Sequence, residues 1–444
     1  MAAQYFFDVI YSIANCLVCF PSSPQLKINS RSFKMLRLLG EGGFSYVYLV
    51  QDTSTSELYA LKKIRCPFGA ESVSQALKEV EAYTLFSTVP NIIHCIDHAV
   101  QNDSGSKVSG IGNAGDDGSK TVYILLPYYR RGNLQDAINA NLVNHTKFPQ
   151  KRLMELMLGV ARALKGMHQY RMPKGLGGQA VGAKNKARAV RAEAANADRD
   201  AAKRAGKSQK PKRREMVAEP PDQEDGREED IPLMEGEVTR AQEGVGEGEL
   251  RAYAHRDIKP GNIMISDDGH TPILMDLGSL SPSPTPITSR SLALAVQDTA
   301  AEHSTMPYRA PELFDVKTGS VIDTKVDIWS LGCTLYACLV GKSPFEARSE
   351  ETGGSLSICV LGGDWRFPDE GGNKGKGKQG AAANGNADGG AVAAQGGAIN
   401  DSVREVVRAC LQVEPADRPD IDQLIDVMER CIEGLPEDDG SADP

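Results

Sequence analysis

One short polar loop near the middle of the chain constrains its structure most strongly. Residues 253–262 bring together a carboxylate (Asp257), an ammonium (Lys259) and a carboxamide (Asn262). A second carboxylate, Asp276, directly follows the apolar stretch 272–275, which we expect to be a strand. Such groups can exchange a proton, neutralise an anion and offer oxygen ligands to a hard cation. The sequence therefore predicts a catalytic site built on this loop.

The order and spacing of these residues match two signatures of protein kinases, H-R-D-L-x-x-x-N and D-F-G. Asp257 is predicted to be the general base that accepts the proton of the substrate hydroxyl, and Lys259 to steady the γ-phosphate of ATP. Asn262 and Asp276 are predicted to hold Mg²⁺ through their oxygens. Each residue alone could be a turn-forming side chain or a surface charge, whereas the combination favours catalysis.

A glycine-rich turn lies between two predicted strands at residues 33–39 and 47–50. Glycine has no Cβ, so its backbone N–H can come close to a phosphate. The third glycine of the G-x-G-x-x-G pattern is Ser45 here, which is still a small residue. The residues that we expect to cover the phosphates of ATP are Gly40, Glu41, Gly42, Gly43 and Val47.

A third predicted strand, residues 58–62, carries Lys62, which is expected to hold the α- and β-phosphates. Ala60 would then lie beneath the adenine, with Leu126 at the back of the cleft and Met264 as a further contact. Lys63 is expected to point to the opposite face of the strand, because successive side chains alternate.

A predicted helix over residues 73–86 supplies a carboxylate partner for Lys62. Glu79 and Glu81 both lie on it, and residues two apart on a helix face different directions. Glu79 is four residues before Tyr83, which belongs to the apolar face of the helix. We therefore predict that Glu79 points inward and pairs with Lys62.

Downstream motifs predict contacts around the catalytic loop. Glu312, in an A-P-E motif, is expected to form a buried ion pair with Arg418. Asp327 is expected to accept hydrogen bonds from the backbone of the catalytic loop. Lys259 and Thr305 are the choices typical of serine/threonine specificity.

The chain resembles the eukaryotic protein kinase superfamily over about residues 32–435. Its short sequence motifs are similar to those of the Numb-associated kinase family, in particular the branch of myristoylated and palmitoylated serine/threonine kinases. This resemblance is carried by the motifs GEGGFSYV, YAHRD, LMDLGS and YRAPELF, which begin at residues 40, 253, 274 and 308. It implies Mg-ATP-dependent phosphorylation of protein serines and threonines, often including autophosphorylation. It also implies a helix in the activation segment, where residues 292–301 are expected to be helical.

The implied architecture is an α+β, two-lobed protein-kinase fold with a small β-rich N-terminal lobe and a larger α-helical C-terminal lobe. Residues 281–286 alternate proline with serine and threonine and are expected to form turns. Stretches at about 171–250 and 370–400 cannot bury enough apolar surface to offset chain ordering, so we expect disordered insertions there. The other expected boundaries are 32–126 for the small lobe, with a loop insertion at 102–120, 127–435 for the large lobe, and 436–444 for an acidic tail.

Composition narrows the possible partners. The net charge of −9 argues against a nucleic-acid binder, because a phosphate backbone requires a basic face. The chain has nine cysteines, an odd number that suggests no disulfide framework and a reducing compartment. We therefore expect protein substrates with Ser/Thr acceptors and no nucleic-acid partner.

The N-terminal segment, residues 1–31, is apolar and aromatic over residues 5–20 and includes Cys16 and Cys19. One hypothesis is S-acylation at both cysteines, which would place the protein on the cytoplasmic face of endomembranes, Golgi-like or vacuole-like. The alternative is a strand or helix packed on the domain, with unmodified thiols, in a cytoplasmic protein. Position 2 is Ala2, not glycine, so we expect no N-myristoylation.

Two other functions are compatible with these motifs. The chain could be a membrane-tethered pseudokinase that acts as a scaffold, although every ATP and metal position carries the expected residue type. It could also be a dual-specificity kinase that phosphorylates tyrosine. The interpretation that we favour is an active serine/threonine kinase with Asp257 as its base and with ATP and Mg²⁺ as cofactors.

Overall fold

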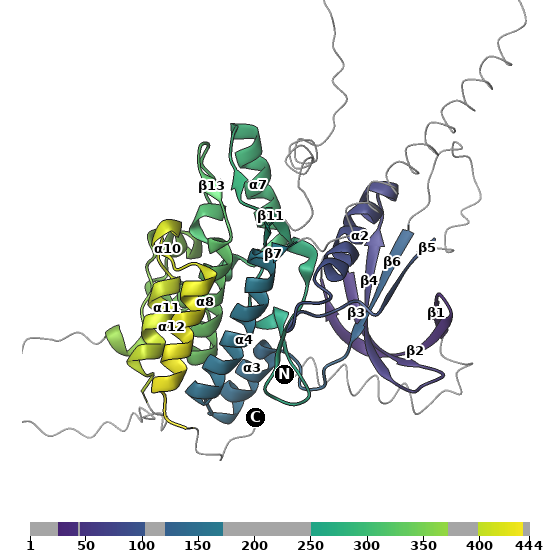
Figure 1. Cartoon of the computed structure of the whole chain (residues 1–444), viewed down its shortest axis with the longest axis horizontal. Helices are drawn as coiled ribbons and strands as arrows, with labels where there is room; N and C mark the ends of the chain where they lie inside the picture. The colour runs from purple at the N-terminus through teal and green to yellow at the C-terminus, as the bar shows by residue number, and fades with distance from the viewer. Residues whose placement is uncertain (1–24, 43–44, 103–119, 172–249, 372–397, 438–444) are drawn as a thin grey trace, which may run out of the picture.

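The computed structural model describes the greater part of the chain, coloured in Figure 1. The described residues are 25–42, 45–102, 120–171, 250–371 and 398–437. The three predicted insertions and the acidic tail lie almost entirely outside these ranges, and so do Gly43, Cys16 and Cys19. Within the described ranges, no helix is both long and apolar enough to cross a membrane.

A six-stranded antiparallel sheet forms the smaller, N-terminal lobe (Figure 1). Its strand order is β1-β2-β3-β4-β6-β5. The strands are β1 (Gln25–Ile28), β2 (Arg31–Glu41), β3 (Ser45–Asp52), β4 (Leu58–Cys66), β5 (Asp97–Asn102) and β6 (Lys120–Pro127). The predicted hairpin is confirmed, because β2 pairs with β3 on either side of the glycine-rich turn.

The first strand lies within the segment that the sequence analysis assigned to the N-terminus. β1 joins the sheet because Ile28 is fully buried in an apolar cluster with Phe33, Val50 and Leu61. This cluster gathers buried residues from four further strands, β2, β3, β4 and β6. The four residues of β1 alone carry too little periodicity to predict the strand.

Helix α2 (Gly69–Leu85) connects the sheet to the larger lobe. It packs against β4 and β6, and also against the 3₁₀ turn η2 (Leu277–Ser279) of the larger lobe. Its buried face includes Val80 and Tyr83, as the apolar periodicity predicted, and also the carboxylate residue Glu79. A charged residue on a buried helix face requires a partner, and the partner comes from β4.

The larger lobe is mainly helical and lies beside the sheet in Figure 1. Its helices are α3 (Leu134–Asn144), α4 (Gln150–His168), α7 (Arg290–His303), α8 (Lys325–Val340), α9 (Pro344–Thr352), α10 (Leu356–Gly362), α11 (Asp401–Cys410) and α12 (Ile421–Gly434). The helix predicted at residues 292–301 is confirmed and corresponds to α7. Most of α8 is buried, and Trp329 on it stacks on Phe345 with ring centroids 5.2 Å apart.

Short strands and turns carry the catalytic loop and the segment after it. The strands are β7 (Tyr170–Arg171), β8 (Leu250–Ala254), β9 (Ile263–Ile265), β10 (Pro272–Leu274), β11 (Ser281–Ser283), β12 (Thr285–Pro286) and β13 (Val321–Ile322). The 3₁₀ turns, besides η2, are η1 (Pro260–Asn262), η3 (Met306–Tyr308), η4 (Pro311–Leu313), η5 (Pro368–Gly371) and η6 (Pro415–Asp417).

Residues 281–286 are not the turns that we expected. They form β11, which pairs with β8, and β12, which pairs with β13. Short edge strands tolerate proline where its missing N–H does not face the partner. Their amino-acid composition is typical of turns. These residues form strands because they pair with β8 and β13, which are distant in the sequence.

The predicted ion pair between Glu312 and Arg418 is confirmed. Arg418 is fully buried, and its two terminal nitrogens donate to Oε1 and Oε2 of Glu312 at 2.7 and 2.9 Å. The guanidinium also lies 4.9 Å from the ring centroid of Trp329. A buried guanidinium must be paired, so this contact fixes the start of α12 against α8 and the A-P-E motif.

Close packing between α8 and α11 depends on a glycine. A Cβ added at Gly332 would lie 2.5 Å from the Cβ of Cys410. We expect Gly332→Ala to lower the free energy of unfolding by about 1–3 kcal/mol in urea titrations, because the helices must move apart. Gly362→Ala is the matched control, since a Cβ there meets nothing within 4 Å. Equal losses in the two variants would contradict this description of the packing.

Candidate active site

Lys62 lies where the two lobes meet. From β4, its Nζ donates to Oε1 and Oε2 of Glu79 at 2.8 and 2.9 Å, and to Oδ1 of Asp276 at 2.9 Å. Glu79 comes from α2, and Asp276 comes from the larger lobe directly after β10. The predicted pairing of Lys62 with Glu79 is confirmed, and Glu81 is exposed.

The charges of this group stabilise one another. Burial disfavours a charged lysine, but the carboxylates of Asp276 and Glu79 outweigh it and raise the pKa of Lys62 above its ordinary value. Lys62 in turn lowers the pKa of Asp276 to about 2. At neutral pH the site therefore presents a fixed ammonium and an ionised aspartate.

Asp276 adopts an uncommon backbone conformation. Its φ is +62°, in the left-handed region that L-residues other than glycine seldom occupy. The backbone of Gly278 lies close to both carboxylates, since a Cβ there would make ordinary contacts with Oδ1 of Asp276 at 3.4 Å and Oε2 of Glu79 at 3.6 Å. The left-handed turn directs the carboxylate toward Lys62, and the cost in backbone strain is typical of functional sites.

Asp257 is held by hydrogen bonds to both of its carboxylate oxygens. Oδ1 accepts from the backbone N–H and the hydroxyl of Thr305, at 2.8 and 2.7 Å. Oδ2 accepts from Nζ of Lys259 at 2.8 Å and from the amide of Asn262 at 3.0 Å. Lys259 also donates to the hydroxyl of Thr305 at 2.7 Å. Residues from the catalytic loop and the activation segment thus converge on one carboxylate.

The backbone of the catalytic loop is anchored to a second, fully buried carboxylate. Asp327 of α8 accepts from the N–H groups of His255 and Arg256 at 2.8 Å each, which confirms its predicted role. Nε2 of His168, at the end of α4, lies 2.9 Å from Oδ2 of the same residue. Burial favours the neutral acid, but the hydrogen bond with His168 and the nearby positive charges outweigh it and lower the pKa of Asp327.

The glycine-rich turn and Ala60 and Leu126, two of the residues predicted to contact the nucleotide, lie on the sheet of the small lobe. Gly40 pairs with Val47 and Glu41 with Tyr46 across β2 and β3, and Gly42 and Ser45 close the turn with backbone hydrogen bonds of 2.8 and 3.3 Å. The remaining residues predicted to contact the nucleotide come from both lobes. In the small lobe, Ala60 on β4 pairs with Leu126 on β6. In the large lobe, Met264 on β9 lies opposite Ile273 and Asn133.

A cavity of about 560 Å³ runs through these groups. The predicted site residues that line it are Gly42, Lys62, Glu79, Asp257, Lys259 and Asp276. The predicted site residues outside its lining are Gly40, Glu41, Val47, Ala60, Leu126, Asn262 and Met264. The cavity therefore corresponds to the phosphate and acceptor end of the cleft, not to the adenine end.

The residues at this end fit a magnesium ion with phosphate ligands. Asp276 offers an ionised carboxylate. The amide nitrogen of Asn262 donates to the carbonyl and to Oδ2 of Asp257, at 2.8 and 3.0 Å, so its amide oxygen is the atom left to act as a ligand. Mg²⁺ in proteins commonly takes one or two such oxygens together with phosphate and water.

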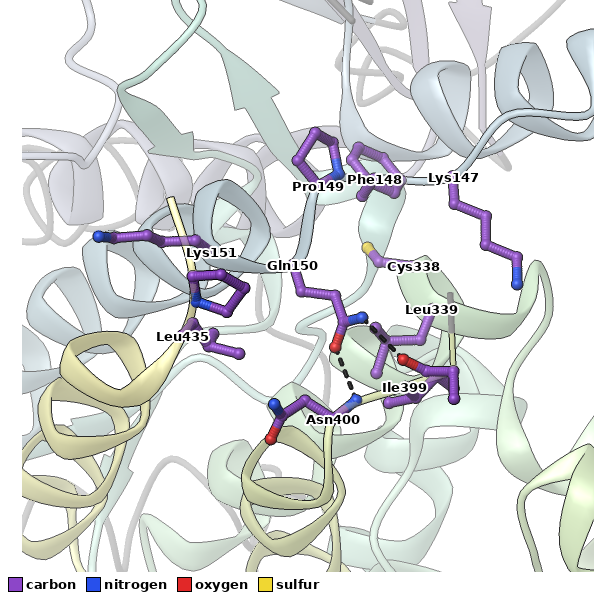
Figure 2. A pocket seen from close by; sticks show the side chains of 12 residues that line it. Lys147, Phe148, Pro149, Gln150, Lys151, Cys338, Leu339, Ile399, Asn400 and Leu435 are labelled. Carbon is purple, nitrogen blue, oxygen red and sulfur yellow. Dashed lines mark hydrogen bonds between the residues drawn. The ribbon is translucent and has the colours of Figure 1, made fainter. Parts of the chain in front are cut away.

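A second cavity, of about 340 Å³, lies at the start of α4, at the other end of that helix from His168 (Figure 2). The side chain of Gln150 bridges two neighbours there: it donates to the carbonyl of Ala398 at 3.1 Å and accepts from the N–H of Asn400 at 2.8 Å. The lining includes no carboxylate and no histidine. This cavity therefore lacks the carboxylates that the first cavity offers to a hydroxyl proton and to Mg²⁺.

Sequence reasoning missed three side chains that support the site. The hydroxyl of Tyr83 donates to Oε1 of Glu79 at 2.7 Å, His168 contacts Asp327, and the hydroxyl of Ser279 donates to the carbonyl of His255 at 2.6 Å. Tyr83 and His168 lie on otherwise apolar helix faces, where a polar tip is the only available signal of a buried partner.

Comparison with known proteins identifies the family. Residues 33–172 and 250–428 match the protein kinase domain family. The chain is 32% identical over 421 residues to serine/threonine-protein kinase ENV7 of Saccharomyces cerevisiae, covering 92% of this chain and 94% of that protein. It is 30% identical to serine/threonine-protein kinase ppk13 of Schizosaccharomyces pombe, over 91% and 92% of the two chains. It is 27% identical to serine/threonine-protein kinase 16 of Homo sapiens, over 77% and 80%.

The chain therefore belongs to the protein kinase family and is a serine/threonine protein kinase. Members of this family generally use ATP with Mg²⁺ and act on protein hydroxyls.

The anchor at Asp327 gives a pH-dependent prediction. Its pKa is lower in the folded chain than the ordinary value of about 4, so the ionised carboxylate stabilises the fold above that pH. Asp327→Asn is expected to lower the free energy of unfolding at pH 7 by about 1.5–3 kcal/mol, because hydrogen bonds to a charged acceptor are lost. The gap between wild type and variant should narrow as the pH falls below about 4.

Chemical unfolding at a series of pH values measures this gap. Asp315→Asn is the control, because Asp315 is exposed, and it should change the free energy of unfolding by no more than about 0.5 kcal/mol. A gap for Asp327→Asn that stays constant from pH 7 to pH 2 would contradict the assignment.

Proposed function

We propose that this kinase binds Mg-ATP at the cleft between its lobes and transfers the γ-phosphate to serine or threonine hydroxyls of proteins, including its own. The observation that carries the proposal is the convergence of Lys62, Glu79 and Asp276 beside the Asp257–Lys259–Thr305 group. Bound Mg²⁺ would neutralise phosphate charge, and Asp276 and Asn262 would hold it.

Three side chains would have separate roles around the acceptor hydroxyl and the phosphates. Asp257 is fixed by four hydrogen bonds and would orient the acceptor hydroxyl and take its proton. Lys259 lies between Asp257 and Thr305, where its charge can stabilise the phosphate as it moves. Lys62, held by Glu79, would bind the α- and β-phosphates.

The pseudokinase alternative has no support at these positions. Lys62, Glu79, Asp257, Asn262 and Asp276 carry the residue types that phosphoryl transfer requires. The contact of Lys259 with Thr305 favours serine/threonine over dual specificity, since both are the choices typical of serine/threonine kinases.

Transfer activity separates these functions. Asp257→Ala is expected to lower kcat by about 10²–10⁴-fold, the usual contribution of a general base to the rate.

Lys62→Ala should also abolish most phosphate transfer. Lys63→Ala is the matched control: it lies one residue along the strand, on the other face, and should retain activity. ADP release and radiolabel transfer measure the activity of all three variants. Equal activity in wild type and Asp257→Ala would favour the scaffold, and a predominance of phosphotyrosine after autophosphorylation would favour dual specificity.

Within the family, we place the chain in the Numb-associated group, on its branch of lipid-modified serine/threonine kinases. The four motifs that begin at residues 40, 253, 274 and 308 support this placement, together with the helix α7 (Arg290–His303) in the activation segment. The same placement favours residence on the cytoplasmic face of endomembranes, Golgi-like or vacuole-like, with the cytoplasm as the alternative.

S-acylation at Cys16 and Cys19 would provide the membrane anchor. Each buried CH₂ contributes ~0.8 kcal/mol, so two chains hold a protein firmly and one holds it marginally. The double variant Cys16→Ser/Cys19→Ser is expected to move from the membrane pellet to the supernatant on fractionation. Cys95→Ser, at a half-buried thiol of the small lobe, is the control and should pellet like wild type. A double variant that pellets fully would exclude this anchor.

A further inference from the structure

The catalytic cavity continues beyond the groups that phosphoryl transfer uses. Its outer part lies between the turn that joins β4 to α2 and the C-terminal end of α7. One wall of this part combines the apolar residues Ile64, Pro67, Phe68 and Ala76 with the polar residues Arg65, Ser72 and Gln75, and the facing wall carries Glu302 and His303. The phosphate-binding and proton-accepting groups all lie in the inner part, so the outer part has room for a different group.

Phe68 is the feature of this wall that most needs an explanation. Its side chain is 74% exposed, more than any other large apolar side chain of the described residues. The turn that carries it is not loose: the backbone N–H of Phe68 donates to the hydroxyl of Ser72 at 3.0 Å, and that hydroxyl donates to the carbonyl of Gly69 at 3.4 Å. An exposed aromatic side chain on an ordered turn beside a cavity is an available apolar contact.

The occupant follows from the connection of the outer part to the acceptor position. Thr305, which contacts both Asp257 and Lys259, lines the same cavity, and residues 302–304 directly before it form the facing wall. A protein segment that presents a hydroxyl to Asp257 therefore has neighbouring side chains close to this wall. The charged groups of the outer part have both signs, Glu302 on the facing wall and Arg65 close to Phe68 in the sequence, so together they favour neither a strongly acidic nor a strongly basic residue.

We propose that the outer part of the cavity is a specificity subsite for an apolar side chain of the protein substrate, next to the residue that is phosphorylated, and that Phe68 selects this side chain. The proposal deepens the proposed function and rests on it. Phe68 lies on the turn before α2 and has no polar side-chain atom that could bind phosphate or metal, so we assign it to substrate choice and not to phosphate transfer.

The test uses the full chain and an array of peptides with one serine, in which each flanking position carries in turn Phe, Leu, Asp, Lys or Gly. Wild type is expected to prefer Phe or Leu over Asp at one flanking position by roughly tenfold in kcat/KM, the usual effect of a small apolar subsite. Phe68→Ala should remove this preference by raising KM, with kcat unchanged. Phe68→Leu should retain it. Val100→Ala, at a 43% exposed apolar residue on β5 outside the cavity, is the matched control and should behave like wild type.

Three results would overturn the proposal. An active Phe68→Ala variant with the wild-type profile at every position would exclude Phe68 as the selecting residue. A preference for Asp that Arg65→Ala removes would assign the subsite to an acidic substrate, because Arg65 also lines the cavity. A folded wild-type chain that transfers phosphate neither to any peptide nor to itself would overturn the proposed function and this subsite together, whereas the first two results leave the proposed function in place.

Discussion

The ammonium of Lys62 is the contact on which the rest of the active site depends. It lies between Glu79 of the small lobe and Asp276 of the large lobe, so a single charge sets the position of α2 relative to the catalytic segments. Without a cation between them, two carboxylates this close together would repel each other. With Lys62 in place, the pKa of Asp276 is held at about 2, and a nucleotide with its metal meets a preformed set of charges.

A second buried charge organises the other half of the site. Asp327 binds two consecutive backbone N–H groups of the catalytic loop and the ring of His168, and it belongs to α8, the most buried helix. The loop geometry is therefore fixed by a rigid element rather than by the loop itself, which is how a catalytic carboxylate such as Asp257 is kept in place before substrate arrives. Glu312 and Arg418 perform a related task at the start of the same helix, where Arg418 also donates to the carbonyl of Lys325 at 3.0 Å.

The sequence predicted the contacts whose geometry follows from regular spacing. Strand alternation separated Lys62 from Lys63, and helix periodicity chose Glu79 over Glu81. Motif spacing placed Asp257, Lys259 and Asn262 in one loop. Contacts made by the polar tips of apolar-face residues, such as Tyr83 with Glu79, were not predicted, since nothing local distinguishes them from ordinary core residues. The strands at residues 281–286 were also missed, because their partners β8 and β13 are distant along the chain.

The central claim is that separated polar side chains converge to bind one metal-complexed nucleotide, and calorimetric titration with ATP tests it most directly. The account predicts that wild type binds ATP more tightly when Mg²⁺ is present, and that Asp276→Asn loses this dependence while remaining folded. A folded wild-type protein without affinity for ATP in the presence of Mg²⁺ would contradict the account.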